Sequence, residues 1–422
     1  MPGRLRHIAL DVTPLRVSRD FRLLWTGSFI SAFGSQFVRV GLYVQVYTLT
    51  GSPAQVGLLG LSAIVGNVAG TVIGGSFIDA HDRRSVLIWT QLGHIAVSGI
   101  LVAGAIGGHP SLLLLNAANL LIWALGAMDG PARQAAMPRL VGAGLMPSAV
   151  ALTQVLWQTS AIVGPAFAGI LIGRTSPTAA YAVDLVSYAG LLVAALEMQP
   201  LPPIPSPDGG RPVGLRAFRE GVRYVTHHRL ILSTFVIDLI AMIFGMPAAL
   251  FPVLAIEQFH RGPAVVGLLF AAPAVGALVQ LLVAGSVTRI RRQGEAVIWA
   301  VAGWGAAIAA FGLVGAHLGW ALLFLAIAGA ADVVSAIFRS TILQVNIPDA
   351  LRGRLGGIFL LVVSGGPRLG DLEAGLVAVV VSPTFSVVSG GLACIVGAFA
   401  CAAGYPELRR YEAPDPSSRS SG

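Results

Sequence analysis

The sequence contains no lysine, so all 27 of its Lys and Arg residues are arginine. The phosphate-binding loop G-x-x-x-x-G-K-[ST] depends on its lysine to contact nucleotide phosphates, so the chain cannot bind ATP through that motif. We therefore expect any energy that the protein uses to come from an ion or solute gradient or from a separate subunit.

Charged residues are also scarce. They make up 11% of the 422 residues, whereas soluble domains carry about 25%, because charge has to cover a soluble surface. Hydrophobic residues make up 55% and recur in segments of about 20 residues, the length that crosses a bilayer. A soluble core could not bury so many helices that are apolar on every side, so the composition indicates an integral membrane protein.

Cysteine is nearly absent. Cys394 and Cys401 lie seven residues apart in one apolar segment. In a helix they would stand ~10 Å apart, too far for a disulfide between them, and we interpret both as small core residues. The eight histidines include no H-E-x-x-H pattern and no metal-ligand spacing occurs, so we expect neither a metal nor a cofactor. Residues 1–22 hold five arginines before the first apolar run and do not resemble a cleavable signal peptide.

Twelve apolar segments follow one another in two sets of six. We predict an all-α membrane fold of twelve transmembrane helices in two six-helix parallel repeats. The predicted parts are a cytoplasmic N-terminal segment, a six-helix half, a linker with an amphipathic helix, a second six-helix half and a disordered cytoplasmic tail, at residues 1–22, 23–198, 199–229, 230–404 and 405–422. The predicted spans are 23–47, 55–78, 86–107, 111–129, 149–173, 178–198, 230–254, 264–288, 295–315, 319–340, 355–380 and 384–404.

The linker begins with prolines between Pro200 and Pro207, which block helix continuation. After them, residues 215–225 carry apolar side chains at helical spacing on one face and arginines on the other. Two interpretations stay open for this helix, which lies either on the cytoplasmic membrane surface or against the base of the bundle. The tail is rich in Pro, Ser and charge, which predicts disorder.

Arginines gather in one set of loops and in the linker, whereas the opposite loops hold only Arg174 and Arg261. Because positive residues near span ends stay in the cytoplasm, this bias places both termini there, as an even number of spans requires. We expect a multi-pass monomer in the bacterial plasma (inner) membrane, surrounded by lipid. The net charge of +8 is spread over short loops rather than one basic face, so we expect no nucleic-acid partner.

The loop after the second predicted span carries Gly75, Asp79, Arg83 and Arg84. These residues match the G-x-x-x-D-[RK]-x-G-[RK]-[RK] loop of the major facilitator superfamily, which the chain resembles, although two other loop positions depart from the pattern. Charges at helix ends can latch or release a neighbouring helix, and we interpret the loop as such a latch. An ordinary positive-inside loop is the alternative.

The fifth predicted span contains Gly164, Pro165 and Gly169, which resemble the G-P-x-x-G-G element of the superfamily's antiporters. Proline kinks a helix and small residues allow close helix contacts, so generic packing is the alternative to an antiport motif. Three further strings resemble the branch that contains the enterobactin exporter and macrolide-efflux-like proteins. These strings are residues 20–25, 131–135 and 347–354.

Ionisable residues inside apolar spans cost about 2.5–3.5 kcal/mol each on insertion scales, so each needs a reason. Asp238 and Asp332 have no basic residue one turn away in their own helices. We predict that they are unpaired and that at least one of them exchanges a proton, with Glu373 as a third candidate; a bond to a neighbouring Ser or Thr is the alternative.

The remaining intramembrane charges have more structural interpretations. Arg368 and Asp371 are spaced i, i+3 and predict a self-neutralising pair, and we group Arg39 with them as intramembrane charges. The resemblance implies that Asp184 lies on a peripheral span, where we expect it to bond to a neighbouring helix.

The resemblance implies a transporter rather than an enzyme. We expect a secondary active exporter of an amphipathic small molecule (a drug, siderophore or secondary metabolite) that works by proton antiport and alternating access. The alternatives are an importer or uniporter of a small polar solute, and a membrane sensor or embedded enzyme. The candidates for cargo contact are the aromatic residues Phe33, Tyr43, Trp157 and Phe244.

Overall fold

The computed structural model describes residues 11–108, 110–202, 215–283, 290–348 and 352–413, and these residues form helices joined by short connections. They divide into two compact units. Unit 1 comprises Met1–Leu49, Ser62–Val213 and Gly262–Ala271, and unit 2 comprises Thr50–Leu61, Gly214–Arg261 and Ala272–Gly422. The units follow the predicted halves apart from two short exchanged segments.

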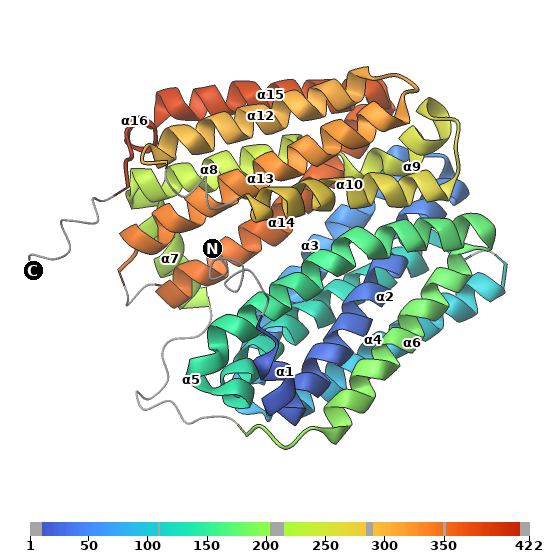
Figure 1. Cartoon of the computed structure of the whole chain (residues 1–422). Coiled ribbons are helices and arrows are strands. Elements are labelled where there is room, and N and C mark those ends of the chain that lie inside the picture. The colour runs from blue at the N-terminus through green and yellow to red at the C-terminus, as the bar shows by residue number, and fades with distance from the viewer. Residues whose placement is uncertain (1–10, 109, 203–214, 284–289, 349–351, 414–422) are drawn as a thin grey trace, which may run out of the picture. The chain divides into compact units, whose positions relative to one another are not determined.

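Unit 1 is built around α4, which packs against α5 and α6 (Figure 1). Capping residues account for the sharp helix starts: the side chain of Asp82 accepts a hydrogen bond from Ser85 N (3.1 Å), and that of Ser111 accepts one from Leu114 N (3.2 Å). Its helices are α1 (Thr13–Val17), α2 (Arg19–Thr50), α4 (Arg83–Ile106), α5 (Leu112–Arg174), α6 (Pro177–Glu197) and the part of α3 (Pro53–Ala80) from Ser62 onward, and the start of α10 (Pro263–Leu282), up to Ala271, also belongs to this unit.

Helix α5 runs for 63 residues and contains both the fourth and the fifth predicted spans. Its one non-helical backbone position is Gly142, with φ of 71°. Positive φ values are accessible to glycine without a Cβ penalty, so this glycine lets the chain turn between the spans without a loop. The helical structure therefore continues through residues 130–148, between the two spans that the hydropathy pattern predicts.

Unit 2 is built around α12, which packs against α13 and α15, and around α8, which packs against α14 and α15 (Figure 1). Its longer helices are α7 (Leu215–His227), α8 (Arg229–Phe244), α12 (Gln293–Leu313), α13 (Leu318–Asn346), α14 (Arg352–Val380), α15 (Pro383–Gly404) and the part of α10 (Pro263–Leu282) from Ala272 onward, and the start of α3, up to Leu61, also belongs to this unit. Its short turns are η2 (Ala248–Leu250), α9 (Phe251–Val253), η3 (Leu254–Gln258) and α16 (Pro406–Arg409).

The seventh predicted span is not one helix. Helix α8 ends before Gly245 and Pro247, and the chain continues through the short turns η2, α9 and η3. Proline cannot donate the backbone hydrogen bond that a continuous helix needs. The indole Nε1 of Trp304 donates to the carbonyl of Gly245 (3.0 Å), which satisfies a carbonyl freed at the break.

Each of the twelve predicted spans overlaps a helical segment among the described residues, although the seventh is broken and residues 284–288 of the eighth lie outside the described part. Nine helical segments among the described residues are long and apolar enough to cross a membrane, and α5 is one of these although it holds two predicted spans. The predicted first and eleventh spans coincide with α2 and α14.

Helix α7 lies where the amphipathic helix is predicted and packs on the bundle. Its Val225 is buried, and Tyr224 packs beside it against a cluster that includes Phe235 and Leu355. Residue Val222 on the same helix stays 37% exposed. These contacts favour the second interpretation, a helix packed on the bundle's base.

The predicted disorder of the tail from residue 405 is wrong for its first nine residues. Helix α16 buries Leu408, and Glu407 pairs with Arg229 (3.2 Å). The Ala413 N–H donates to the carbonyl of Arg291 (2.8 Å). One apolar side chain and a few polar bonds therefore order a segment whose composition alone predicts disorder; residues 414–422 lie outside the described part.

Candidate functional site

The candidate site is a buried charge cluster in unit 2, formed by Asp238 on α8 with Asp332 and Arg339 on α13. The guanidinium of Arg339 is in direct contact with the Asp238 carboxylate, and both side chains are almost fully buried, at 3% and 1% exposed. Arg339 Nη2 lies 3.9 Å from Asp332 Oδ1, and the Asp332 side chain is 35% exposed. One arginine therefore faces two carboxylates, and the cluster carries a net charge of −1 when both are ionised.

The prediction that Asp238 and Asp332 are unpaired is wrong, because Arg339 contacts one and lies near the other. Hydropathy placed Arg339 at the end of the tenth span, but α13 continues to Asn346 and buries it. The missed signal is the spacing: Arg339 follows Asp332 by seven residues, or nearly two helical turns, so both lie on one face.

Unit 1 contains a second buried cluster that sequence analysis did not single out. Asp129 on α5 contacts Arg133 one turn later, and the two side chains are 10% and 11% exposed. On α4, Gln91 Nε2 donates to Asp129 Oδ1 (3.0 Å), and Thr90 Oγ1 lies 3.4 Å from the same oxygen. This carboxylate therefore has one cation and two neutral donors, and it ties α4 to α5.

Two further polar contacts in unit 1 join α4 to α6. Asp184 is fully buried and accepts a hydrogen bond from Ser98 Oγ (2.6 Å), as its predicted role of bonding a neighbouring helix requires. The ring of His94 stacks on Tyr188 with centroids 4.3 Å apart. Its Nδ1 lies 2.8 Å from the Thr90 carbonyl, which can only accept, so Nδ1 carries the hydrogen.

The predicted pair on α14 is confirmed, with Arg368 Nη1 3.3 Å from Asp371 Oδ2. The other oxygen of Asp371 accepts from Ala249 N (2.9 Å) in the broken segment after α8, so this carboxylate also has a structural role. In unit 1, the guanidinium of Arg39 lies over the Phe270 ring, 4.8 Å from its centroid. Glu373 is half-buried.

The loop arginines bind the end of α6. Arg84 donates from Nε to the Ala195 carbonyl (2.9 Å) and from an Nη to the Leu196 carbonyl (2.6 Å), and Arg83 N donates to the carbonyl of Leu201 (3.0 Å). The bonds from Arg84 satisfy two carbonyls that the C-terminus of α6 leaves free, and the bond from Arg83 holds the chain just beyond it. Gly75 lies in the last turns of α3, and the Asp79 side chain lies outside the described part of the chain, so the latch stays a prediction.

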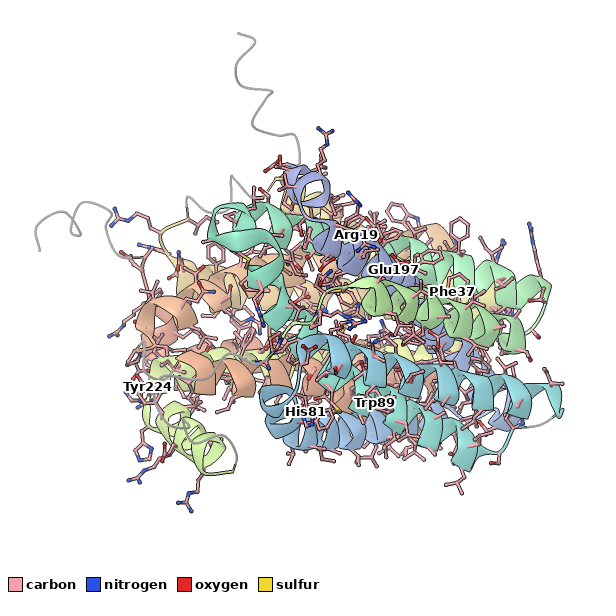
Figure 2. The ribbon with its side chains drawn as sticks, turned by 90° about the horizontal axis from the view of Figure 1, so that it is seen from below. Arg19, Phe37, His81, Trp89, Glu197 and Tyr224 are labelled. Atoms are coloured by element: carbon pink, nitrogen blue, oxygen red, sulfur yellow. The ribbon has the colours of Figure 1, made fainter. Side chains whose placement is uncertain are left out.

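The same end of unit 1 carries an ion pair between Arg19 at the start of α2 and Glu197 at the end of α6, 3.1 Å apart (Figure 2). Next to it, Gln199 N donates to Asp20 Oδ2 (3.0 Å). The first residues of the linker, which follow the end of α6, are therefore hydrogen-bonded to the start of α2.

The antiporter-like motif consists of helix contacts. A Cβ at Gly164 would lie 2.7 Å from Gln36 on α2, and one at Gly169 would lie 2.5 Å from the Pro263 carbonyl at the start of α10. Pro165 lies within the helical range of α5. The motif therefore packs α5 closely against two helices, as its small residues predict.

The aromatic candidates for cargo contact differ in their surroundings. Phe33 packs against Phe37 with ring centroids 5.2 Å apart, and Tyr43 is buried with its ring edge-on to Phe270 (5.3 Å). Trp157 is 45% exposed and Phe244 is half-buried. We therefore retain Trp157 as the most accessible of the four.

Solved transporter structures share this fold. A mutant of the nucleoside transporter NupG superposes with a TM-score of 0.75 at 16% identity, covering 91% of this chain and 99% of that one. A peptide transporter POT in complex with sulfate gives 0.72 at 13% identity, covering 93% and 95%. The fold is therefore that of the major facilitator transporters.

Sequence comparison gives the family. A model described as "Transmembrane secretion effector" matches residues 10–421, and the chain belongs to this family of the major facilitator superfamily. The enterobactin exporter EntS of Citrobacter koseri is 27% identical over 414 residues, covering 96% of this chain and 97% of that protein. EntS of Escherichia coli is 26% identical over 422 residues, covering 98% of each. The protein is thus a multi-pass membrane transporter of a small-molecule substrate, and not an enzyme.

Proposed function

We propose that the protein exports an amphipathic small molecule, such as a drug, siderophore or secondary metabolite, in exchange for protons. It works as a monomer by alternating access in the bacterial inner membrane, with both termini in the cytoplasm. Export is supported by the secretion family and by the relatives' name as enterobactin exporters. Proton exchange is supported by the excess carboxylate in the cluster of Asp238, Asp332 and Arg339.

The cost of burying a charge supports proton exchange in this cluster. A buried arginine neutralises one carboxylate, and a second carboxylate in the same low-dielectric region remains costly while it is ionised. Binding a proton removes that cost, and releasing it restores a net negative charge. A cluster with one more carboxylate than arginine can therefore hold a proton in one conformation and lose it in another.

A membrane potential of 100 mV contributes about 2.3 kcal/mol per elementary charge moved. Since 1.4 kcal/mol corresponds to a tenfold concentration ratio, one net charge per cycle can drive a gradient of roughly fortyfold. This is enough for concentrative efflux without ATP, in keeping with a chain that has no lysine for a phosphate-binding loop.

The test is transport in proteoliposomes with an imposed pH gradient, using enterobactin as one probe and ethidium as a second. We expect probe movement to follow the gradient and probe addition to dissipate it. Equal movement with and without the gradient would replace antiport by facilitated diffusion, the uniporter alternative. A gradient that drives accumulation in the uptake direction would favour an importer.

A further inference from the structure

We propose that Asp332 is the residue that takes up and releases the transported proton, and that Arg339 is a positioning residue that keeps Asp238 ionised. This proposal rests on the proposed proton exchange and assigns that exchange to the carboxyl group of Asp332. It follows from three differences between the two carboxylates in unit 2.

The first difference is contact. Asp238 touches the Arg339 guanidinium, whereas Asp332 lies 3.9 Å from it. Coulomb attraction falls with distance, so the cation stabilises the charge on Asp238 more than the charge on Asp332. Among the described residues, Arg339 is the cation that faces either carboxylate.

The second difference is access. The Asp238 side chain is 1% exposed and that of Asp332 is 35% exposed. The Asp332 oxygen that faces Arg339 is buried without a hydrogen-bond partner in the described part of the chain. The described residues therefore cover Asp332 less completely than Asp238, and the ion pair does not enclose its carboxyl group.

The third difference is connection. The contact between Arg339 and Asp238 joins α13 to α8, whereas Arg339 and Asp332 lie on the same helix. When Asp332 is protonated, Arg339 interacts with Asp238 alone and the cluster is neutral. When Asp332 releases its proton, the new carboxylate competes for the same guanidinium and weakens the tie between α8 and α13. Proton occupancy is thereby converted into the strength of a helix–helix contact.

The unused donors of Arg339 fit this competition. Its Nε and Nη1 form no hydrogen bond that meets ordinary geometry among the described residues, although Nη1 is in contact with Asp238. A guanidinium presents five N–H donors, so Arg339 has donors left to turn toward Asp332. Ser335 lies on α13 between Asp332 and Arg339. Its hydroxyl is also buried without a hydrogen-bond partner among the described residues.

The experiment follows protonated carboxyl groups by infrared difference spectroscopy as the purified transporter in lipid nanodiscs is titrated between about pH 5 and pH 9, the range in which proton-coupled groups have to work. No cargo is needed. We expect the wild type to lose a carboxylic C=O band that the Asp332→Asn variant lacks and the Asp238→Asn variant keeps; bands of other buried carboxyl groups, such as Asp184, are common to all three and cancel in the difference. Loss of the band in Asp238→Asn with its retention in Asp332→Asn would overturn the assignment.

The positioning role has its own variants. Arg339→Gln removes the cation, so we expect two carboxyl groups to titrate instead of one, whereas Arg339→Lys should restore one. If Arg339→Gln fails to fold, the Lys variant still tests the role, because two bands there would contradict it. Ser335→Ala is the matched control on the same helix and should titrate as the wild type does.

The outcome is separable from that of the proposed function. A wild type that shows the Asp332 band but transports independently of the pH gradient contradicts the proposed antiport and leaves Asp332 as a proton-binding residue without a transport role, which overturns the proposal. A gradient-driven wild type whose titrating band persists in Asp332→Asn leaves antiport intact and overturns the assignment alone.

Discussion

Each unit holds an aspartate that follows the pattern Gly-Ala-x, as Gly126-Ala127-Met128-Asp129 in α5 and as Gly329-Ala330-Ala331-Asp332 in α13. The two residues have different partners. Asp129 has one arginine in contact and two neutral donors from α4. Asp332 shares Arg339 with Asp238. Its carboxylate lies 3.9 Å from the Arg339 guanidinium, and its side chain is 35% exposed. The comparison shows that the same local pattern ends in an aspartate with three polar partners in one unit and in an aspartate that shares a single arginine in the other.

The largest expected effect is a difference in unfolding free energy between variants of Asp129 and variants of Asp332. Asp129→Asn leaves the guanidinium of Arg133 buried without its counter-charge, and we expect a loss of about 3–5 kcal/mol. Asp332→Asn leaves Arg339 in contact with Asp238, so we expect a change within about 1 kcal/mol. Thermal unfolding in detergent can be followed with a thiol-reactive fluorophore, because Cys394 and Cys401 are both buried in the folded chain.

A double variant sharpens this test. Removing Arg133 together with Asp129, as Asp129→Asn with Arg133→Gln, should recover part of the lost stability, because no unpaired charge remains. Equal losses of stability in Asp129→Asn and Asp332→Asn would show that the two clusters have the same structural role, which contradicts the difference inferred between them.

A smaller effect concerns the glycines that open the two strings. A Cβ at Gly329 would collide with the Pro273 carbonyl on α10, whereas a Cβ at Gly126 meets nothing within 4 Å. We expect Gly329→Ala to cost about 1–3 kcal/mol through overpacking. Gly126→Ala should be neutral or stabilising by up to about 1 kcal/mol, because alanine favours the helix. The same thiol assay measures both, and a costly Gly126→Ala would contradict the described surroundings of α5.

The smallest expected effect is a difference in amide exchange between residues 11–18 of unit 1 and the segment around Leu408 in unit 2. Hydrogen bonds from the side chains of Thr13 and Ser148, followed by one from the Thr13 backbone, lower the pKa of Asp11 below its ordinary 3.8. This attachment of α1 is therefore present above about pH 4 and is lost as the pH falls through the lowered pKa. We expect amide exchange in residues 11–18 to rise below that pH.

Asp11→Asn should exchange rapidly in this segment at every pH, and this variant checks the assignment. The C-terminal segment of unit 2 provides the comparison, because the buried Leu408 and a backbone bond from Gly294 N to Tyr411 O (3.2 Å) also hold it. Its exchange should change less over the same range. Equal changes at both termini would show that Asp11 does not govern the attachment.

The positions of the spans could be predicted from sequence because crossing a bilayer requires about 20 apolar residues, a local property that each segment carries by itself. Helix ends were less predictable. Arg133 lies beyond the fourth predicted span and Arg339 at the end of the tenth, yet α5 and α13 continue past them and bury them, because each finds a carboxylate in the folded unit. The break in the seventh span depends on Gly245 and Pro247 together with the Trp304 hydrogen bond, and the last of these is a long-range contact.

By itself, the sequence determined the helical membrane class, the sites of the spans and the resemblance to a transporter family, because apolar length and loop motifs are read along the chain. The tertiary structure alone decided which charges are partners. Arg339 follows Asp332 by nearly two turns of α13, but its ion pair with Asp238 forms between residues 101 positions apart. Whether a buried carboxylate is a tie or a proton site depends on how many cations and carboxylates the fold brings together, and contacts between helices decide that number.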